Sequence, residues 1–280
     1  MKNIFKWALV LPLIASISFV SCNKDDDDPV TPVVTSPVDG KVLIYEETST
    51  EAEVDVKVYA DEALYVGYNQ LYVLLYEQGT KNMIKSAHVT FATEMTMMMG
   101  MSHASPIEDP SNTDPSDGVF QGAAVFIMPS EGNGTWTFKV HVHNHANNME
   151  GEVMSEVNVI SPTEAKMYSF LSATDNAKVF VSLVEPMMPE VGENKFEVVV
   201  HSKATMMSFP SMEDLNIEIE PEMPTMGHGS PNNVNPTHIG NGHYEGVVNY
   251  TMTGLWRVHM TVKDKDGNVM NDANYFDMTF

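Results

Sequence analysis

The stretch Trp136-Thr137-Phe138-Lys139-Val140-His141-Val142 decides the fold, because apolar and polar residues alternate along it without interruption. Strict alternation is typical of a half-buried β-strand, since successive side chains point to opposite faces of a sheet. Trp256-Arg257-Val258-His259-Met260-Thr261-Val262 shows the same pattern later in the chain. The two stretches predict equivalent strands in two copies of one domain.

Comparison of the chain with itself supports this duplication. Tyr65–Leu71 aligns with Glu190–Phe196, and Trp136 aligns with Trp256. Further matches pair Met101, His103, Ser105 and Pro106 with Met226, His228, Ser230 and Pro231, and Gly118, Phe120, Gly122 and Met128 with Gly242, Tyr244, Gly246 and Met252. Self-similarity of this kind indicates repeated structural units. We therefore predict two homologous domains, 41–161 and 162–280.

Both repeats consist of short apolar runs separated by Gly, Asn and Pro, which is typical of strands joined by turns. The predicted strands are Val54–Tyr59, Leu71–Tyr76, Val119–Ile127, Trp136–Val142, Val179–Val184, Phe196–Val200, Tyr244–Tyr250 and Trp256–Val262. Asp264–Gly267 predicts a hairpin turn rather than a calcium loop, because Asp-Gly supplies the positive φ angles of a tight turn. The predicted fold class is all-β, with two tandem immunoglobulin-like β-sandwich domains.

An export signal opens the chain. Met1–Lys6 carries two lysines, and Trp7–Val20 is an apolar run that is too short to span a bilayer comfortably. Small residues before Cys22 resemble a bacterial lipobox, so we predict a lipoprotein signal peptide over 1–21 and lipidation of Cys22. An ordinary signal peptide with a chance cysteine is the alternative.

Residues 22–40 are predicted to be a tether. Asn23–Asp28 holds four consecutive aspartates, and its position resembles the acidic export tag of cell-surface lipoproteins, while Pro29–Gly40 is a proline-rich linker. Lipid on Cys22 would hold the protein at a membrane. We expect an outer-membrane lipoprotein exposed at the cell surface, with a periplasm-facing orientation left open.

The amino-acid composition excludes several classes of function. Asp and Glu outnumber Lys and Arg by 38 to 15, which argues against nucleic acid as a partner, because phosphate-binding faces need clustered basic residues. The single Cys excludes disulfide scaffolds and multi-thiolate metal sites. The 22 Met exceed the 12 Leu, which inverts the usual order.

The second repeat carries three motifs in order: Met223-Pro224-Thr225-Met226, Gly242-His243-Tyr244-Glu245-Gly246 and Met252-Thr253-Gly254-Leu255-Trp256. This order resembles the YtkA-like and FixH-like family of small extracytoplasmic β-sandwich domains. The resemblance covers Pro186–Lys263 well and Asp61–His143 more loosely. It implies the sandwich fold and a link to copper handling.

The residues support copper independently of that resemblance. Thioether is a soft donor that favours Cu(I), and imidazole suits both copper states. The predicted ligands are Met223, Met226, His228 and Met252 in the second repeat, and Met98, Met101, His103 and Met128 in the first, where Met97 is an alternative to Met98. Core packing is the competing interpretation, most strongly for Met128 and Met252, because Met is an adaptable core filler. Sacrificial oxidation and a Met-rich partner surface also stay open.

His141, His143 and His145 form a second candidate. Alternation places all three on one face if the strand continues, which suits Cu(II), Ni(II) or Zn(II), and a solvent-facing histidine stripe is an equal alternative. His243 is a further candidate ligand.

No motif indicates catalysis, since nucleophile elbows, phosphate-binding loops and His-Glu-x-x-His are absent from the sequence. The sequence therefore predicts a non-enzymatic, lipid-anchored protein that buffers or transfers copper, with copper-efflux or cuproprotein-assembly proteins as partners. A non-catalytic surface lipoprotein with immunoglobulin-like modules for adhesion or assembly is the alternative.

Overall fold

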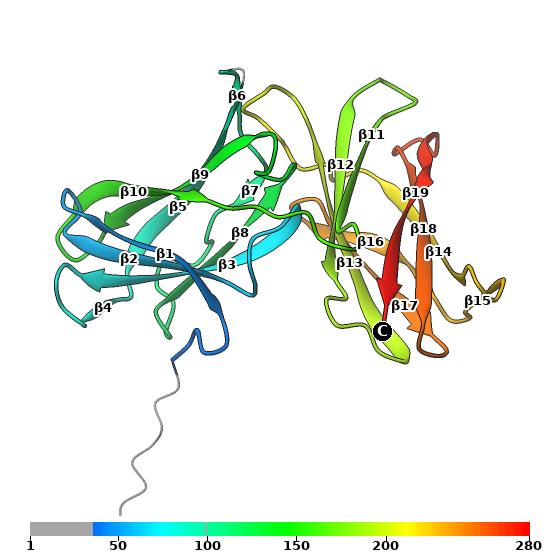
Figure 1. Ribbon diagram of the computed structural model, residues 1–280, viewed down its shortest axis with the longest axis horizontal. Coiled ribbons are helices and arrows are strands. Elements are labelled where there is room, and N and C mark those ends of the chain that lie inside the picture. Colours follow the sequence, from blue (N-terminus) through cyan, green and yellow to red (C-terminus); the bar gives the residue numbers. More distant parts are fainter. Residues whose placement is uncertain (1–35, 99) are drawn as a thin grey trace, which may run out of the picture. The chain divides into compact units, whose positions relative to one another are not determined.

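The computed structural model describes residues 36–98 and 100–280 (Figure 1). The predicted signal peptide, Cys22 and most of the tether lie outside the described residues. All of the regular elements in the described ranges are β-strands. Within those ranges, no helix is long and apolar enough to cross a membrane.

The first repeat forms two facing sheets. One sheet has the order β1-β2-β3-β8-β7, with β4 added beside β3. Its strands are β1 (Val42–Ser49), β2 (Val54–Ala60), β3 (Gly67–Glu77), β4 (Met83–Ile84), β7 (Ile107–Glu108) and β8 (Val119–Phe126). The other sheet has the order β10-β9-β5-β6. Its strands are β5 (Ala87–Met97), β6 (Ser102–His103), β9 (Gly134–Asn144) and β10 (Met149–Val157).

The second repeat has the same plan. Its larger sheet runs β11-β12-β13-β17-β16 and its smaller sheet runs β15-β14-β18-β19. The strands of the larger sheet are β11 (Met167–Leu171), β12 (Lys178–Glu185), β13 (Gly192–Ser202), β16 (Val234–Gly240) and β17 (His243–Tyr250). Those of the smaller sheet are β14 (Asn216–Met223), β15 (His228–Gly229), β18 (Leu255–Lys263) and β19 (Val269–Thr279).

Alternating burial produces the two cores. Along β9 every second side chain from Trp136 to Val142 is buried, and the residues between them are partly exposed. The same alternation runs from Trp256 to Val262 in β18. Each core joins residues from both sheets of its repeat, so each repeat is a β-sandwich.

The predicted strands are confirmed. Seven of the eight lie wholly within an observed strand, and the eighth, Val119–Ile127, exceeds β8 by one residue. The hairpin at Asp264–Gly267 is confirmed as well, since the Asp264 N–H donates to Asn268 O at 2.9 Å and Gly267 has a φ of 85°.

Residues from both repeats also share a small apolar cluster, in which Tyr68, Ala123 and Val125 pack with Val199. Pro37–Phe280 accordingly form one compact unit. The boundary between 41–161 and 162–280 stays a prediction.

Candidate metal-binding site

His103 and Met128 meet at the end of the first sandwich. His103 ends β6 and is 4% exposed, and its Nε2 lies 3.1 Å from Met128 Sδ. Its Nδ1 lies 2.8 Å from the Ala104 carbonyl oxygen. Because a carbonyl only accepts, Nδ1 donates, and in the neutral imidazole Nε2 keeps its lone pair directed at the sulfur.

Trp136 fixes the segment that carries Met128. Its indole Nε1–H donates to the Met128 carbonyl at 2.9 Å, and its ring meets that of His103 edge to face, with centroids 5.2 Å apart. Trp136 is fully buried, so it is a rigid wall beside the imidazole and the thioether. Two of the predicted ligands of this repeat, His103 and Met128, therefore lie side by side, and their role as metal ligands stays a prediction.

The register of the sheet places Met95, rather than Met98, at the position equivalent to Met223. Met95 pairs with His103, and Met223 pairs with His228. Met98 lies in the turn after β5 with 82% of its surface exposed, and Met101 is also exposed. Strand β5 itself ends at Met97. Met99 lies outside the described residues.

The second repeat holds the equivalent groups in a looser arrangement. His228 Nδ1 donates to the Gly229 carbonyl at 3.0 Å, and its ring lies 5.9 Å from that of Trp256. The Trp256 indole N–H donates to the Met252 carbonyl at 2.9 Å, which repeats the contact of Trp136 with Met128. The site histidine therefore has the same tautomer in both repeats.

The thioethers of the second repeat do not converge on His228. Met223 is buried in the core, whereas Met226 and Met252 are exposed. Among the described residues, no thioether makes a contact with His228 like that of Met128 with His103. The four predicted ligands of the second repeat are therefore brought together only in part.

The histidine stripe is partly as expected. His141 and His143 lie on the outer face of β9, and His145 follows the strand end with its ring centroid 5.4 Å from that of His143. His88 on β5 pairs directly with His143, a neighbour that sequence reasoning missed because it depends on strand register. Within the described ranges, no three His, Cys, Asp or Glu side chains are arranged to hold a metal ion.

His243 has a structural role. Its Nδ1 lies 2.6 Å from a carboxylate oxygen of Glu197, and its Nε2 lies 2.8 Å from one of Glu108 in the first repeat. Burial favours the neutral imidazole, but the hydrogen bonds to the two carboxylates outweigh it and raise the pKa of His243 to about 9. Both ring nitrogens of His243 are hydrogen-bonded to carboxylates. His243, a candidate extra ligand from the sequence, therefore forms a charged hydrogen-bonded link between the two repeats.

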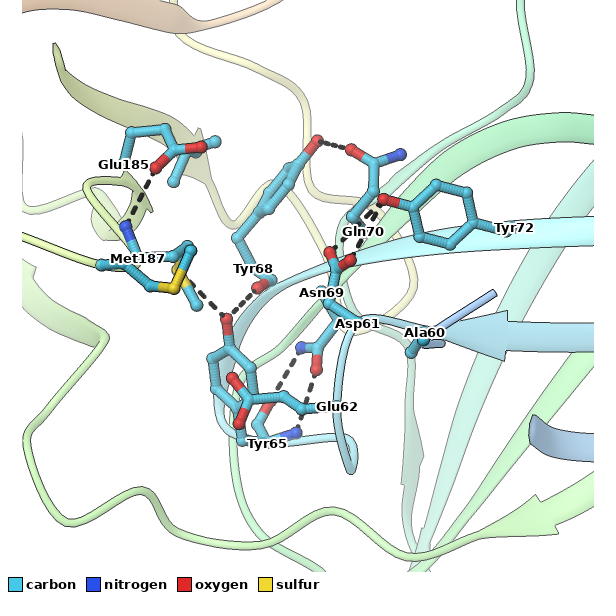
Figure 2. Close-up of a pocket in the computed structure, with 13 residues that line it drawn as sticks. Ala60, Asp61, Glu62, Tyr65, Tyr68, Asn69, Gln70, Tyr72, Glu185 and Met187 are labelled. Atoms are coloured by element: carbon cyan, nitrogen blue, oxygen red, sulfur yellow. Dashed lines mark hydrogen bonds between the residues drawn. The ribbon is translucent and has the colours of Figure 1, made fainter. Parts of the chain in front are cut away.

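A groove of about 780 Å³ lies beside β3, and the sequence did not reveal it (Figure 2). The Tyr65 hydroxyl donates to the Tyr68 carbonyl at 2.7 Å and lies 3.9 Å from Met187 Sδ. The Lys41 ammonium lies 4.4 Å from the centre of the Tyr72 ring. Internal contacts thus already occupy several of the polar and aromatic groups that line the groove.

Comparison with known proteins shows a family similarity in the second repeat. Residues 173–261 match the model of the YtkA-like family. That segment contains Met223, His228, Met252 and Trp256, so the candidate site of the second repeat lies within the matched residues. None of the curated proteins matches the chain.

Solved structures give only distant similarities. The chain shares 11% identity with the Yersinia pseudotuberculosis adhesin InvE over 83% of its own length and 61% of that chain, with a TM-score of 0.28. It shares 8% identity with a DUF4785 family protein from Legionella pneumophila, over 81% of its own length and 56% of that chain, with a TM-score of 0.27. It shares 11% identity with invasin, a bacterial integrin-binding protein, over 81% of its own length and 39% of that chain, with a TM-score of 0.24. The chain thus spans less than two thirds of each, and at these scores the likeness adds nothing to the fold described above.

Proposed function

We propose, from the YtkA-like match of residues 173–261 and the donor geometry of the first repeat, that this protein binds copper outside the cytoplasm. Cu(I) is the favoured state, and the role is buffering or transfer rather than catalysis. Copper-efflux or cuproprotein-assembly proteins are the proposed partners. The observation that carries the proposal is the 3.1 Å approach of His103 Nε2 to Met128 Sδ.

His103 Nε2 and Met128 Sδ lie close enough to share one soft cation. A thioether sulfur and the unprotonated nitrogen of an imidazole are both lone-pair donors, so they do not attract each other directly. A soft cation held by both donors satisfies them at once.

The donor set fits Cu(I) better than harder ions. Thioether and imidazole are ligands for soft and borderline metals, while Mg²⁺ and Ca²⁺ require oxygen. The two donors are neutral, so only the charge of the ion enters the site. When bound, copper would supply a soft cation that is passed on without a protein thiol, which suits an oxidising compartment.

Anaerobic titration of the mature chain with Cu(I), in competition with bicinchoninate, tests the proposal. We expect sub-micromolar binding of one or two ions, with one ion lost in His103→Ala combined with Met128→Leu. Met154→Leu is the matched control, because it removes an exposed thioether from the same sheet. Affinity no higher than that of a Met-poor β-sandwich would overturn the proposal.

Exposed thioethers favour a second candidate function. Met98 and Met188 are 82% and 89% exposed. We propose, as the alternative, a non-catalytic surface protein whose sandwiches serve adhesion or assembly, with these methionines as contact surface. Failure of the copper titration, together with partner binding that is lost in Met98→Ser and Met188→Ser, would favour this function.

The membrane attachment is proposed from sequence, since Cys22 lies outside the described residues. Lipidation at Cys22 would place the protein at the outer membrane, and the acidic segment after it favours the cell surface. We expect Cys22→Ser to move the protein from the membrane fraction to the soluble fraction. Protease treatment of intact cells distinguishes a surface location from a periplasm-facing one.

A further inference from the structure

Ala104 connects the site of the first repeat to a turn of the second. Its carbonyl accepts from His103 Nδ1 at 2.8 Å, and its own N–H donates to the carbonyl of Met206 at 2.9 Å. One residue thus fixes the tautomer of the site histidine and holds the backbone of Met206 beside it. This contact links segments about 100 residues apart in sequence, so no local pattern predicts it.

The turn that carries Met206 is tightly built. The Ala204 N–H donates to Ser208 O at 3.0 Å, and the Met207 N–H donates to the Thr205 hydroxyl at 3.1 Å. At its tip, Met206 and Met207 are 40% and 56% exposed. The turn therefore carries two adjacent exposed thioethers, and one backbone hydrogen bond joins it to Ala104, the residue that follows His103.

The two sites differ in accessibility. His103 is 4% exposed, whereas His228 in the second repeat is only partly buried. An ion that enters the His103–Met128 pair must lose its solvent or chelator ligands before it reaches a nitrogen that water barely contacts. Exposed donors of the same softness on the neighbouring turn would replace those ligands one by one.

We propose that Met206 and Met207 are entry donors, through which Cu(I) reaches and leaves the His103–Met128 pair. The inference rests on the proposed copper function and adds a role for the second repeat in loading the site of the first. Each step exchanges one neutral ligand for another on Cu(I), so no electron or proton is transferred. Only the ion moves, and the released chelator returns to solution.

Stopped-flow transfer of Cu(I) from its bicinchoninate complex, under anaerobic conditions, tests the inference. The variant is Met206→Leu with Met207→Leu, which keeps apolar volume and removes both sulfur atoms. We expect transfer to slow about tenfold, which corresponds to about 1.4 kcal/mol in the barrier, while stoichiometry and equilibrium affinity stay close to those of the unsubstituted protein. Met188→Leu is the matched control, since Met188 is exposed on a different turn.

The outcomes separate the two proposals. Loading of the double variant at the unsubstituted rate, or equal slowing by Met188→Leu, overturns the entry role and leaves the copper function standing. Absence of Cu(I) binding by the unsubstituted protein overturns both. Equal thermal unfolding curves for all three proteins ensure that a slow rate reflects lost sulfur rather than lost structure.

Discussion

Met95 and Met223 occupy the same position in the two sandwiches, because each pairs directly with the site histidine of its own repeat. Both side chains are almost fully buried, at 0% and 3% exposure. The buried position explains why a methionine recurs there without further appeal to metal binding. The same position places a thioether on the strand beside each histidine.

Truncation of either residue should destabilise its sandwich. We expect Met95→Ala and Met223→Ala each to lower the free energy of unfolding by about 2–5 kcal/mol, because a buried Met leaves a cavity that the core fills only in part. Chemical denaturation measures the change. The Leu variants keep the volume and should cost less than about 1.5 kcal/mol. Cu(I) affinity that is unchanged in Met95→Leu assigns Met95 to packing alone.

Stability should fall in alkaline solution because of His243. Its pKa is raised from 6.5 to about 9, so its contribution to stability is complete below pH 6.5 and is lost as the pH rises through 9. The loss should reach at most about 3 kcal/mol, measured as the free energy of unfolding against pH. His243→Gln should remove this pH dependence. A parent protein with a flat profile between pH 7 and 10 would contradict the assignment.

His201 should produce the opposite dependence in acid. Its side chain is buried, its Nδ1 has no hydrogen-bond partner among the described residues, and burial lowers its pKa to about 4. Its contribution is therefore present above pH 6.5 and is lost as the pH falls toward 4, because the unfolded chain takes up the proton first. A His201→Phe variant should lose less stability between pH 6.5 and 4.5 than the parent, as followed by urea denaturation at each pH.

Gly246, which ends the Gly242–Gly246 motif, and its first-repeat equivalent Gly122 should resist substitution. A Cβ on Gly246 would lie 2.4 Å from the Val234 carbonyl oxygen, and one on Gly122 would lie 2.4 Å from the Glu108 carbonyl oxygen. We expect Gly246→Ala to cost about 2–3 kcal/mol of unfolding free energy, since backbone must move to make room. Gly267→Ala is the control, because that position is open and only its φ of 85° is unfavourable. Similar costs for the two would contradict a steric role.

The histidine stripe predicts a separate response to divalent ions. Cu(II), Ni(II) or Zn(II) should perturb the imidazole NMR signals of His143 and His145, whose rings are already in contact, and His88 should respond with them. His141 should respond less, because its Nε2 lies 3.6 Å from a Glu150 carboxylate oxygen. Uniform weak shifts across every surface histidine would instead indicate a solvated stripe.

The strands could be predicted from sequence because burial alternates along them. Trp136–Val142 and Trp256–Val262 show a period of two that survives in the structure as alternating buried and partly exposed side chains. The duplication, and the equivalence of His103 in the first repeat to His228 in the second, could also be predicted, because similar local sequence recurs in both repeats. The YtkA-like match then confirms the family resemblance of the second repeat.

The ligand set was harder to predict because strand register is not local. The loop between Met95 and His103 is three residues longer than that between Met223 and His228, so alignment by sequence alone assigned Met97 or Met98 to the position of Met223. The contact of Ala104 with Met206 and the pairing of His88 with His143 depend on which segments lie together in the folded chain. Residue spacing carries no signal for such contacts.

The indole contacts of Trp136 and Trp256 should make the intrinsic tryptophan fluorescence of the protein sensitive to its two candidate sites. Each indole N–H is bonded to the carbonyl of the site methionine, and each ring faces the site histidine. The third tryptophan, Trp7, belongs to the predicted signal peptide, so the mature chain would emit only from these two positions. Fluorescence of single Trp→Phe variants would then report occupancy of one repeat at a time, without an added dye.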